Sequence, residues 1–124
     1  MASRVEVEEF IRASFRSVWA LELISLLRSQ DGALSHREMV ERLRASDFVI
    51  AQCLENLAAV GLVCRNEDGS AFYRPFSKVL DDLVARTEQL YGSSPNAVRR
   101  IIATATNPGI AAFSNAFRLR KDEE

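Results

Sequence analysis

The feature that most constrains the fold is a pair of short predicted helices joined by a tight turn. Ser35 and Glu38 form the Ser-x-x-Glu pattern of a capping box, which predicts a helix over residues 35–45. Ser46 is a second N-cap, and it predicts another helix that ends at Gly61. Because the two helices meet within about three residues, they have the spacing of two helices that cross around a turn.

The segments on either side of this helix pair predict a long helix before it and a β-hairpin after it. Apolar residues recur at helical spacing over residues 5–28, which predicts one largely buried helix, with Gly32 as its left-handed cap. Residues 62–64 and 71–73 have strand character around a turn-forming Asn-Glu-Asp-Gly segment, and Pro75 closes the hairpin.

Three more helices are predicted towards the C-terminus. One covers residues 77–91, and Ser94-Pro95 and Asn107-Pro108 each place an N-cap before a proline at the first helical position. The last two helices carry an apolar stripe that we expect to form a dimer interface with the first helix; it consists of Val98, Ile101, Ile102, Phe113 and Phe117. The predicted fold class is mainly α with a small β-hairpin, in one domain over residues 5–121.

Helix, short helix, tight turn, helix and hairpin is the order of a winged helix-turn-helix. Residues 34–43, 46–57 and 59–65 resemble the winged-helix core of small bacterial regulators of the MarR, ArsR and PadR type, and the resemblance covers residues 17–75. It implies a winged-helix core over residues 8–75 and a C-terminal helical extension over 76–121 for dimerisation or partner binding. It also implies a transcription regulator that binds double-stranded DNA as a homodimer. We expect no cofactor, and we expect a cytoplasmic protein because the sequence has no membrane-spanning run and no signal-peptide pattern.

The resemblance assigns two groups of candidate site residues. The third helix lies in the major groove, and its residues towards the bases or a partner are Ser46, Phe48, Val49, Gln52, Cys53 and Asn56. The second helix and the wing contact the DNA backbone through His36, Arg37, Arg42, Arg65, Asn66 and Arg74.

A third candidate group follows from charge alone. Residues 93–121 contain no acidic residue, and their basic patch consists of Arg99, Arg100, Arg118, Arg120 and Lys121. Such a patch is a solvated face, a nucleic-acid contact outside the wing, or a binding site for an acidic protein partner. The sequence does not distinguish these three interpretations.

The charge of the third helix departs from the pattern of a DNA reader. Residues 46–60 contain no Lys or Arg but two acids, Asp47 and Glu55, so the common contact of a cation with guanine is missing. Gln52 can still read adenine, and Phe48 or Val49 can contact a thymine methyl group. Exposed Phe48 and Val49 equally resemble the anchor of a protein interface, whereas Phe48 turned inwards belongs to the core.

Two functional hypotheses therefore stay open. The first is a DNA-binding transcription regulator. The second is a winged-helix docking module that regulates transcription through a protein partner, such as RNA polymerase or a sigma factor, with little direct DNA binding.

The sequence offers no catalytic or metal site. His36 is the single histidine, and Cys53 and Cys64 lie eleven residues apart, so the close Cys/His pairs of a metal site are missing. Asp81 and Asp82 are adjacent on a predicted helix and point about 100° apart, so they do not converge on one substrate. We therefore expect a non-enzymatic protein without metal or cofactor, and without a membrane span or a signal peptide.

Overall fold

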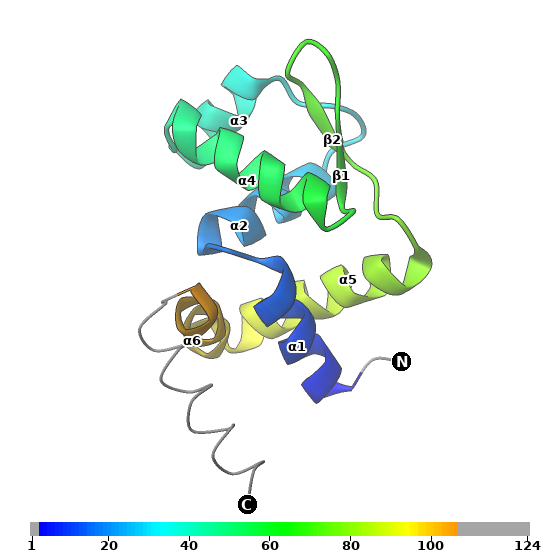
Figure 1. Ribbon diagram of the computed structural model, residues 1–124, viewed down its shortest axis with the longest axis vertical. Coiled ribbons are helices and arrows are strands. Elements are labelled where there is room, and N and C mark those ends of the chain that lie inside the picture. Colours follow the sequence, from blue (N-terminus) through cyan, green and yellow to red (C-terminus); the bar gives the residue numbers. More distant parts are fainter. Residues whose placement is uncertain (1–2, 107–124) are drawn as a thin grey trace, which may run out of the picture.

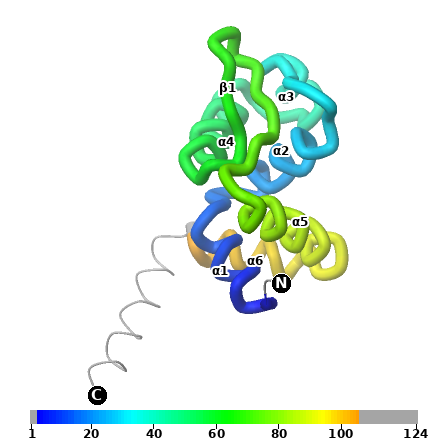
Figure 2. The backbone as a smooth tube through the Cα atoms, turned by 90° about the vertical axis from the view of Figure 1, so that its right-hand side faces the viewer, coloured from blue at the N-terminus to red at the C-terminus, as the bar shows by residue number. Residues whose placement is uncertain are grey.

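The computed structural model describes residues 3–106 and consists of six helices and a two-stranded antiparallel sheet within that range. The elements in chain order are α1 (Arg4–Ser14), α2 (Val18–Arg28), α3 (His36–Leu43), α4 (Asp47–Ala59), β1 (Val63–Arg65), β2 (Ala71–Tyr73), α5 (Lys78–Ser93) and α6 (Pro95–Thr106). The hairpin, α3 and α4 lie at one end of the molecule and α1, α5 and α6 at the other, with α2 between them (Figures 1 and 2). The prediction of a mainly helical fold with a small hairpin is confirmed.

The predicted helix over residues 5–28 is in fact two helices. α1 ends at Ser14, Phe15 is extended, and Ser17 caps α2 by accepting a hydrogen bond from the Ala20 amide at 3.3 Å. The Ser17 hydroxyl offers the backbone a partner outside the helical ladder, which favours a helix start over helix continuation. Because of this break, α1 turns away from α2 and packs on α5 and α6 (Figure 2).

Phe15 anchors the break between α1 and α2. Its side chain is fully buried, and its ring meets that of Phe10 edge to face with centroids 5.7 Å apart. This aromatic pair holds the end of α1 in the core, so the change of direction at Ser17 is fixed by packing as well as by capping.

The predicted glycine cap at Gly32 is wrong. α2 ends at Arg28, its C-cap Ser29 is right-handed, and the positive φ angles among the described residues are at Arg44, Gly61 and Gly69. Gly61 follows α4 with a φ of 80°, and a Cβ there would lie 3.2 Å from the Cβ of Phe76. Glycine is therefore needed at residue 61, where the chain before α5 comes close to the end of α4.

The two helices that the sequence predicted most sharply are confirmed with their caps. Ser35 Oγ accepts from the Glu38 amide at 3.1 Å, and the Glu38 carboxylate accepts from the Ser35 amide at 3.0 Å. These two hydrogen bonds lower the pKa of Glu38. Ser46 Oγ caps α4 by accepting from the Val49 amide at 3.1 Å.

The hairpin is in register with Val63 opposite Tyr73 and Arg65 opposite Ala71. Leu34, just before α3, forms two further backbone hydrogen bonds with Ala71, of 2.9 and 3.0 Å. In the turn, the Asp68 carboxylate accepts from the amide and the hydroxyl of Ser70, which lowers its pKa. Strand β2 of the hairpin is thus hydrogen-bonded to the residue that precedes the α3–α4 pair.

The core is one continuous cluster that joins both ends of the molecule. α2 runs through its middle and has buried side chains on several sides; these are Ala20, Leu21, Leu23, Ile24 and Leu27. Val98 and Ile102 of α6 are also buried within the single chain, where α6 packs on α1 and α5. The expectation that Val98 and Ile102 form a dimer interface is therefore wrong, because one chain already covers them. The predicted helix after Asn107, with Phe113 and Phe117, lies outside the described residues.

A polar cluster connects α2, the hairpin and α5. Tyr73 Oη donates to Asp81 at 2.6 Å, and the Arg28 guanidinium lies 5.9 Å from the Tyr73 ring centroid and pairs with Asp81 and Glu88. Burial and the neighbouring Asp81 raise the pKa of Tyr73. Asp81 and Asp82 point to different partners, as expected, because Asp82 pairs with Arg86 at 3.7 Å.

The raised pKa of Tyr73 predicts an alkaline loss of stability. Tyr73 ionises at about pH 10 in the unfolded chain and at higher pH in the folded one, so its contribution is complete below pH 10 and is lost as pH rises further. Tyr73→Phe removes the hydrogen bond to Asp81 and lowers the free energy of unfolding by about 1 kcal/mol at neutral pH. Urea denaturation should show this difference shrinking above about pH 10; a difference that stays constant with pH would contradict the assignment.

Candidate macromolecule-binding surface

No other part of the described chain covers the outward face of α4. The helix buries Ile50, Leu54 and Leu57 in the core. Its exposed residues are Asp47, Phe48, Ala51, Gln52, Glu55 and Ala59. Phe48 has 69% of its surface exposed, so the alternative that it turns into the core is wrong. An exposed aromatic residue on an uncovered helix face is typical of a binding surface.

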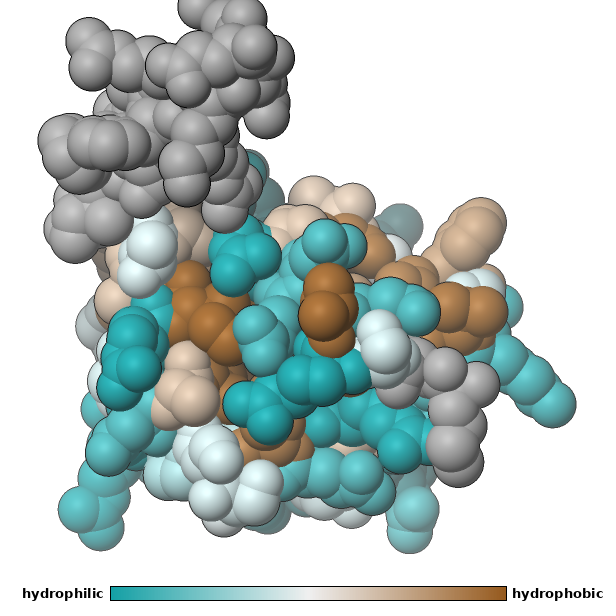
Figure 3. All heavy atoms as spheres, turned by 90° about the horizontal axis from the view of Figure 1, so that it is seen from below, coloured by the Kyte–Doolittle hydropathy of each residue, from teal (hydrophilic) through white to brown (hydrophobic). Residues whose placement is uncertain are grey.

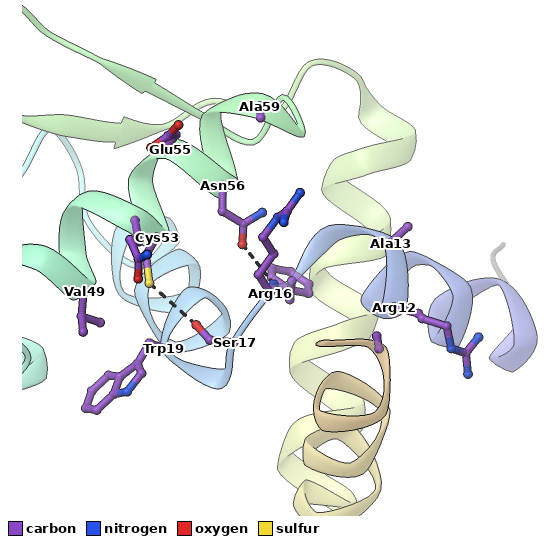
Figure 4. Close-up of a pocket in the computed structure, with 13 residues that line it drawn as sticks. Arg12, Ala13, Arg16, Ser17, Trp19, Val49, Cys53, Glu55, Asn56 and Ala59 are labelled. Carbon is purple, nitrogen blue, oxygen red and sulfur yellow. Dashed lines mark hydrogen bonds between the residues drawn. The ribbon is translucent and has the colours of Figure 1, made fainter. Parts of the chain in front are cut away.

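Two of the predicted recognition-helix residues, Cys53 and Asn56, do not reach this face. Asn56 is buried, and its Nδ2 donates to the Ser14 carbonyl at 2.7 Å. Its Oδ1 accepts from the Arg16 amide at 3.1 Å (Figure 4). Cys53 is also buried, with its Sγ 3.9 Å from Ser17 Oγ, and burial raises the pKa of its thiol. The break between α1 and α2 covers this side of α4.

The other four predicted recognition-helix residues differ in how free their side chains are to contact a partner. Val49 is half-buried, and Ser46 Oγ is engaged as the N-cap of α4. Phe48 and Gln52 are exposed and have side chains without a hydrogen bond to the described part of the chain. They are therefore the two residues of the predicted set that are free to contact a partner.

The N-termini of α3 and α4 and the hairpin turn come together at one end of the molecule. His36 Nε2 lies 3.2 Å from the Asp47 carboxylate, which joins the first residues of the two helices. A Cβ at Gly69 in the hairpin turn would lie 4.0 Å from the Cβ of His36. Helix N-termini present backbone amides and a positive dipole end, which favour an anionic group. The same corner also carries carboxylates, because Glu38 and Asp47 lie in the first turns of the two helices and Glu67 and Asp68 lie in the hairpin turn.

The predicted backbone-contact residues do not gather at this corner. Arg65 ends β1 next to the hairpin turn, but Arg42 is in the last turn of α3 and Arg74 bonds through its amide to Leu62 at the other end of the hairpin. These three are exposed, whereas Arg37 pairs with Glu41 at 3.1 Å. Asn66 is engaged in the hairpin turn, since its Nδ2 donates to Ser70 Oγ at 2.8 Å.

Arg44 is an exposed cation that the sequence analysis did not assign. It has a φ of 54° in the turn between α3 and α4. Within residues 3–106, neither Arg44 nor Arg65 nor Arg74 forms a salt bridge. These three guanidinium groups are thus free for an anionic partner.

The described part of the C-terminal basic patch lies away from the hairpin. Arg99 and Arg100 are on α6, at the opposite end of the molecule (Figure 1). The Arg99 guanidinium lies 5.6 Å from the Tyr91 ring centroid and donates to Tyr91 Oη at 3.4 Å. Three further members of the patch, Arg118, Arg120 and Lys121, lie outside the described residues. Arg99 and Arg100 do not share an end of the molecule with the hairpin.

An open groove of about 940 Å³ lies beside α4 and escaped the sequence analysis. Its walls are the break between α1 and α2, one side of α4 and the end of α6 (Figure 4). Among the lining residues are Arg12, Arg16, Trp19, Val49, Gln52 and Ala105. Trp19 was expected in a buried helix but is 39% exposed here. The break at Ser17 creates this groove, and no sequence pattern indicated it.

Figure 3 shows the end of the molecule opposite the hairpin, where apolar side chains lie among hydrophilic ones and reach the surface. Among the described residues there is no group of three His, Cys, Asp or Glu side chains placed to hold a metal ion. Within the same residues, none of the helices has the length and apolar character needed to cross a bilayer.

Comparison with known proteins adds no relative to this picture: the chain matches no family model, no curated protein and no solved structure.

The two hydrogen bonds of Asn56 give a direct test of the position of the α1–α2 break. Asn56→Ala leaves the Ser14 carbonyl and the Arg16 amide unpaired, so we expect it to lower the free energy of unfolding by about 1–3 kcal/mol. Gln52→Ala, on the exposed side of the same helix, is the control and should change it by less than about 0.5 kcal/mol. Equal effects of the two variants in urea denaturation would show that Asn56 does not fix the break.

Proposed function

We propose that α2, α3, α4 and the β-hairpin form a winged helix-turn-helix in a transcription regulator that binds double-stranded DNA. In this proposal α4 is the recognition helix and the hairpin is the wing. The observation that carries it is the placement of an uncovered α4 beside a corner where two helix N-termini and the hairpin turn meet. A helix in this position enters a major groove while the flanking elements contact phosphates.

The exposed side chains of α4 support base contacts of limited kinds. The Gln52 amide can donate to and accept from adenine in a bidentate arrangement, and the Phe48 ring can contact a thymine methyl group. α4 has 13 residues and is therefore about 20 Å long, which suits insertion of its first turns into the groove. We therefore propose a preference for A·T-containing sites.

Phosphate contacts come from outside α4, because this helix carries no cation. Arg42, Arg44, Arg65 and Arg74 are exposed on α3, in the α3–α4 turn and on the hairpin. Four such residues give modest electrostatic affinity, and a twofold arrangement doubles the number of phosphate contacts and with it the electrostatic part of the binding free energy. We propose a homodimer for this reason; its interface has to use surface other than the buried Val98 and Ile102.

Binding of the full chain to duplexes enriched from a random-sequence library tests the DNA proposal. Gln52→Ala should weaken binding to the enriched duplex by about 1–3 kcal/mol and leave binding to unrelated duplexes unchanged. With four arginines per chain in a dimer, the slope of log affinity against log salt should be no steeper than about −7. Fluorescence anisotropy measures both quantities.

The matched control is Gln89→Ala, which changes an exposed glutamine on α5. It should leave affinity and salt slope at their original values. Failure to enrich any duplex, or equal affinities of Gln52→Ala and Gln89→Ala, would contradict the role of α4.

A second candidate function is docking to a protein of the transcription machinery, such as RNA polymerase or a sigma factor. It is favoured by Phe48, which is 69% exposed on a face that also carries Asp47 and Glu55. An aromatic anchor with a polar rim is typical of protein interfaces, and carboxylates repel DNA phosphates.

Phe48→Asp tests this second candidate. The substituted side chain is exposed, so the free energy of unfolding should change by less than about 0.5 kcal/mol. Binding to purified RNA polymerase holoenzyme should weaken by at least about 2 kcal/mol, as expected for the loss of an interface anchor. Phe76→Asp, at an exposed phenylalanine before α5, is the control and should bind normally. Equal binding of both variants, or no binding of the unmodified chain, would argue against docking.

A further inference from the structure

We propose that the groove beside α4 is the docking site of the chain's own C-terminal segment, residues 107–124. When docked, this segment covers Gln52. Occupation of the groove is independent of the proposed function, whereas its effect on DNA binding rests on that function.

The groove presents apolar surface that is costly to leave in water. Trp19 is 39% exposed and lines the groove together with the half-buried Val49 (Figure 4). A tryptophan of this exposure beside a second apolar side chain is typical of a surface that another segment covers. The volume of about 940 Å³ is large enough for several side chains.

The end of α6 places the C-terminal segment at this groove. Ala105, one residue before the end of α6, is itself a lining residue. The 18 residues of the segment therefore start at the mouth of the groove. A segment tethered so closely has an effective concentration in the millimolar range, which a second copy at micromolar concentration does not match.

The segment has the apolar spacing that this surface requires. Asn107-Pro108 predicts a helix start, and Ile110, Phe113 and Phe117 follow at i, i+3 and i+7, so they share one face of that predicted helix. The two phenylalanines and the isoleucine provide apolar side chains that can cover the exposed surface of Trp19 and Val49. We infer that this face packs on Trp19 and Val49.

The two guanidinium groups of the groove have possible partners at the end of the segment. Arg12 and Arg16 line the groove and form no salt bridge with residues 3–106. The segment carries three consecutive acids, residues 122–124, directly after the cations Arg118, Arg120 and Lys121, so its side chains have no net charge. The charges are therefore complementary in a docked register that brings the acids, and not the cations, next to Arg12 and Arg16.

Docking of the segment is linked to the proposed recognition surface through α4. Gln52 and Glu55 are exposed on the outward side of α4 and also line the groove. A segment in the groove therefore keeps Gln52 from a base edge. The apparent DNA affinity falls in proportion to the fraction of chains whose groove is empty, so a segment docked nine-tenths of the time weakens binding about tenfold.

Trp19 reports directly on the groove because it is the single tryptophan of the chain. In the full chain, Phe113→Asp should shift the Trp19 emission maximum to longer wavelength and increase its quenching by acrylamide. Val79→Asp replaces an exposed valine on α5 that does not line the groove, and it should leave both signals unchanged. The difference between the variants should not depend on protein concentration.

Arg16→Glu is a second variant that keeps the core intact, since Arg16 is exposed; Arg44→Glu is its control. Arg16→Glu should increase Trp19 quenching and Arg44→Glu should not. Equal quenching in the unmodified chain and in both the Phe113 and Arg16 variants would overturn the proposal. A change that appears only with increasing protein concentration would also overturn it, because the occupant would then be a second copy.

DNA binding separates this proposal from the proposed function. If Phe113→Asp increases Trp19 quenching and strengthens binding to the enriched duplex about tenfold, both the docking and its effect on α4 are supported. If quenching increases and DNA affinity does not change, the segment occupies the groove but does not control α4, and the second part of the proposal is wrong.

Discussion

Two hydrogen bonds of one buried side chain, Asn56, hold the N-terminal part of the chain against α4. Its amide group bonds to the Ser14 carbonyl and the Arg16 amide on either side of the break between α1 and α2. With the break fixed there, α1 packs on α5 and α6 instead of continuing α2. The same contact closes one side of α4, including Cys53, and leaves the groove next to Trp19 open. A contact between two residues 42 positions apart in the sequence thus determines which side of α4 a partner can reach.

The hairpin end of the molecule is organised by shorter-range contacts. Capping bonds define α3 and α4, and the His36–Asp47 pair joins their first residues. Tyr73 and Arg28 then connect the hairpin to α5 and α2 through Asp81. A polar cluster therefore joins α5 to the hairpin, while the core of α2 connects the same two ends through apolar packing.

What the sequence predicted well depends on local hydrogen bonds and periodicity. The Ser35 and Ser46 caps, the hairpin turn and the Ser94-Pro95 helix start involve neighbours within a few residues, so a single sequence contains their signal. The break at Ser17 was missed because apolar spacing continues across it, although the Ser17 hydroxyl is a local signal for a helix start. Cys53 and Asn56 were placed wrongly because their burial depends on that break. Trp19 and the groove follow from it too, and no local pattern indicates either.

We propose that the outward face of α4 contacts a DNA duplex. The most direct measurement is the change of backbone amide chemical shifts in the full chain when a library-enriched duplex is added. We expect the largest changes at Phe48, Ala51 and Gln52 and in the hairpin turn, with small changes along the first half of α5. Changes concentrated at Arg99 and Arg100, with α4 unaffected, would contradict the claim.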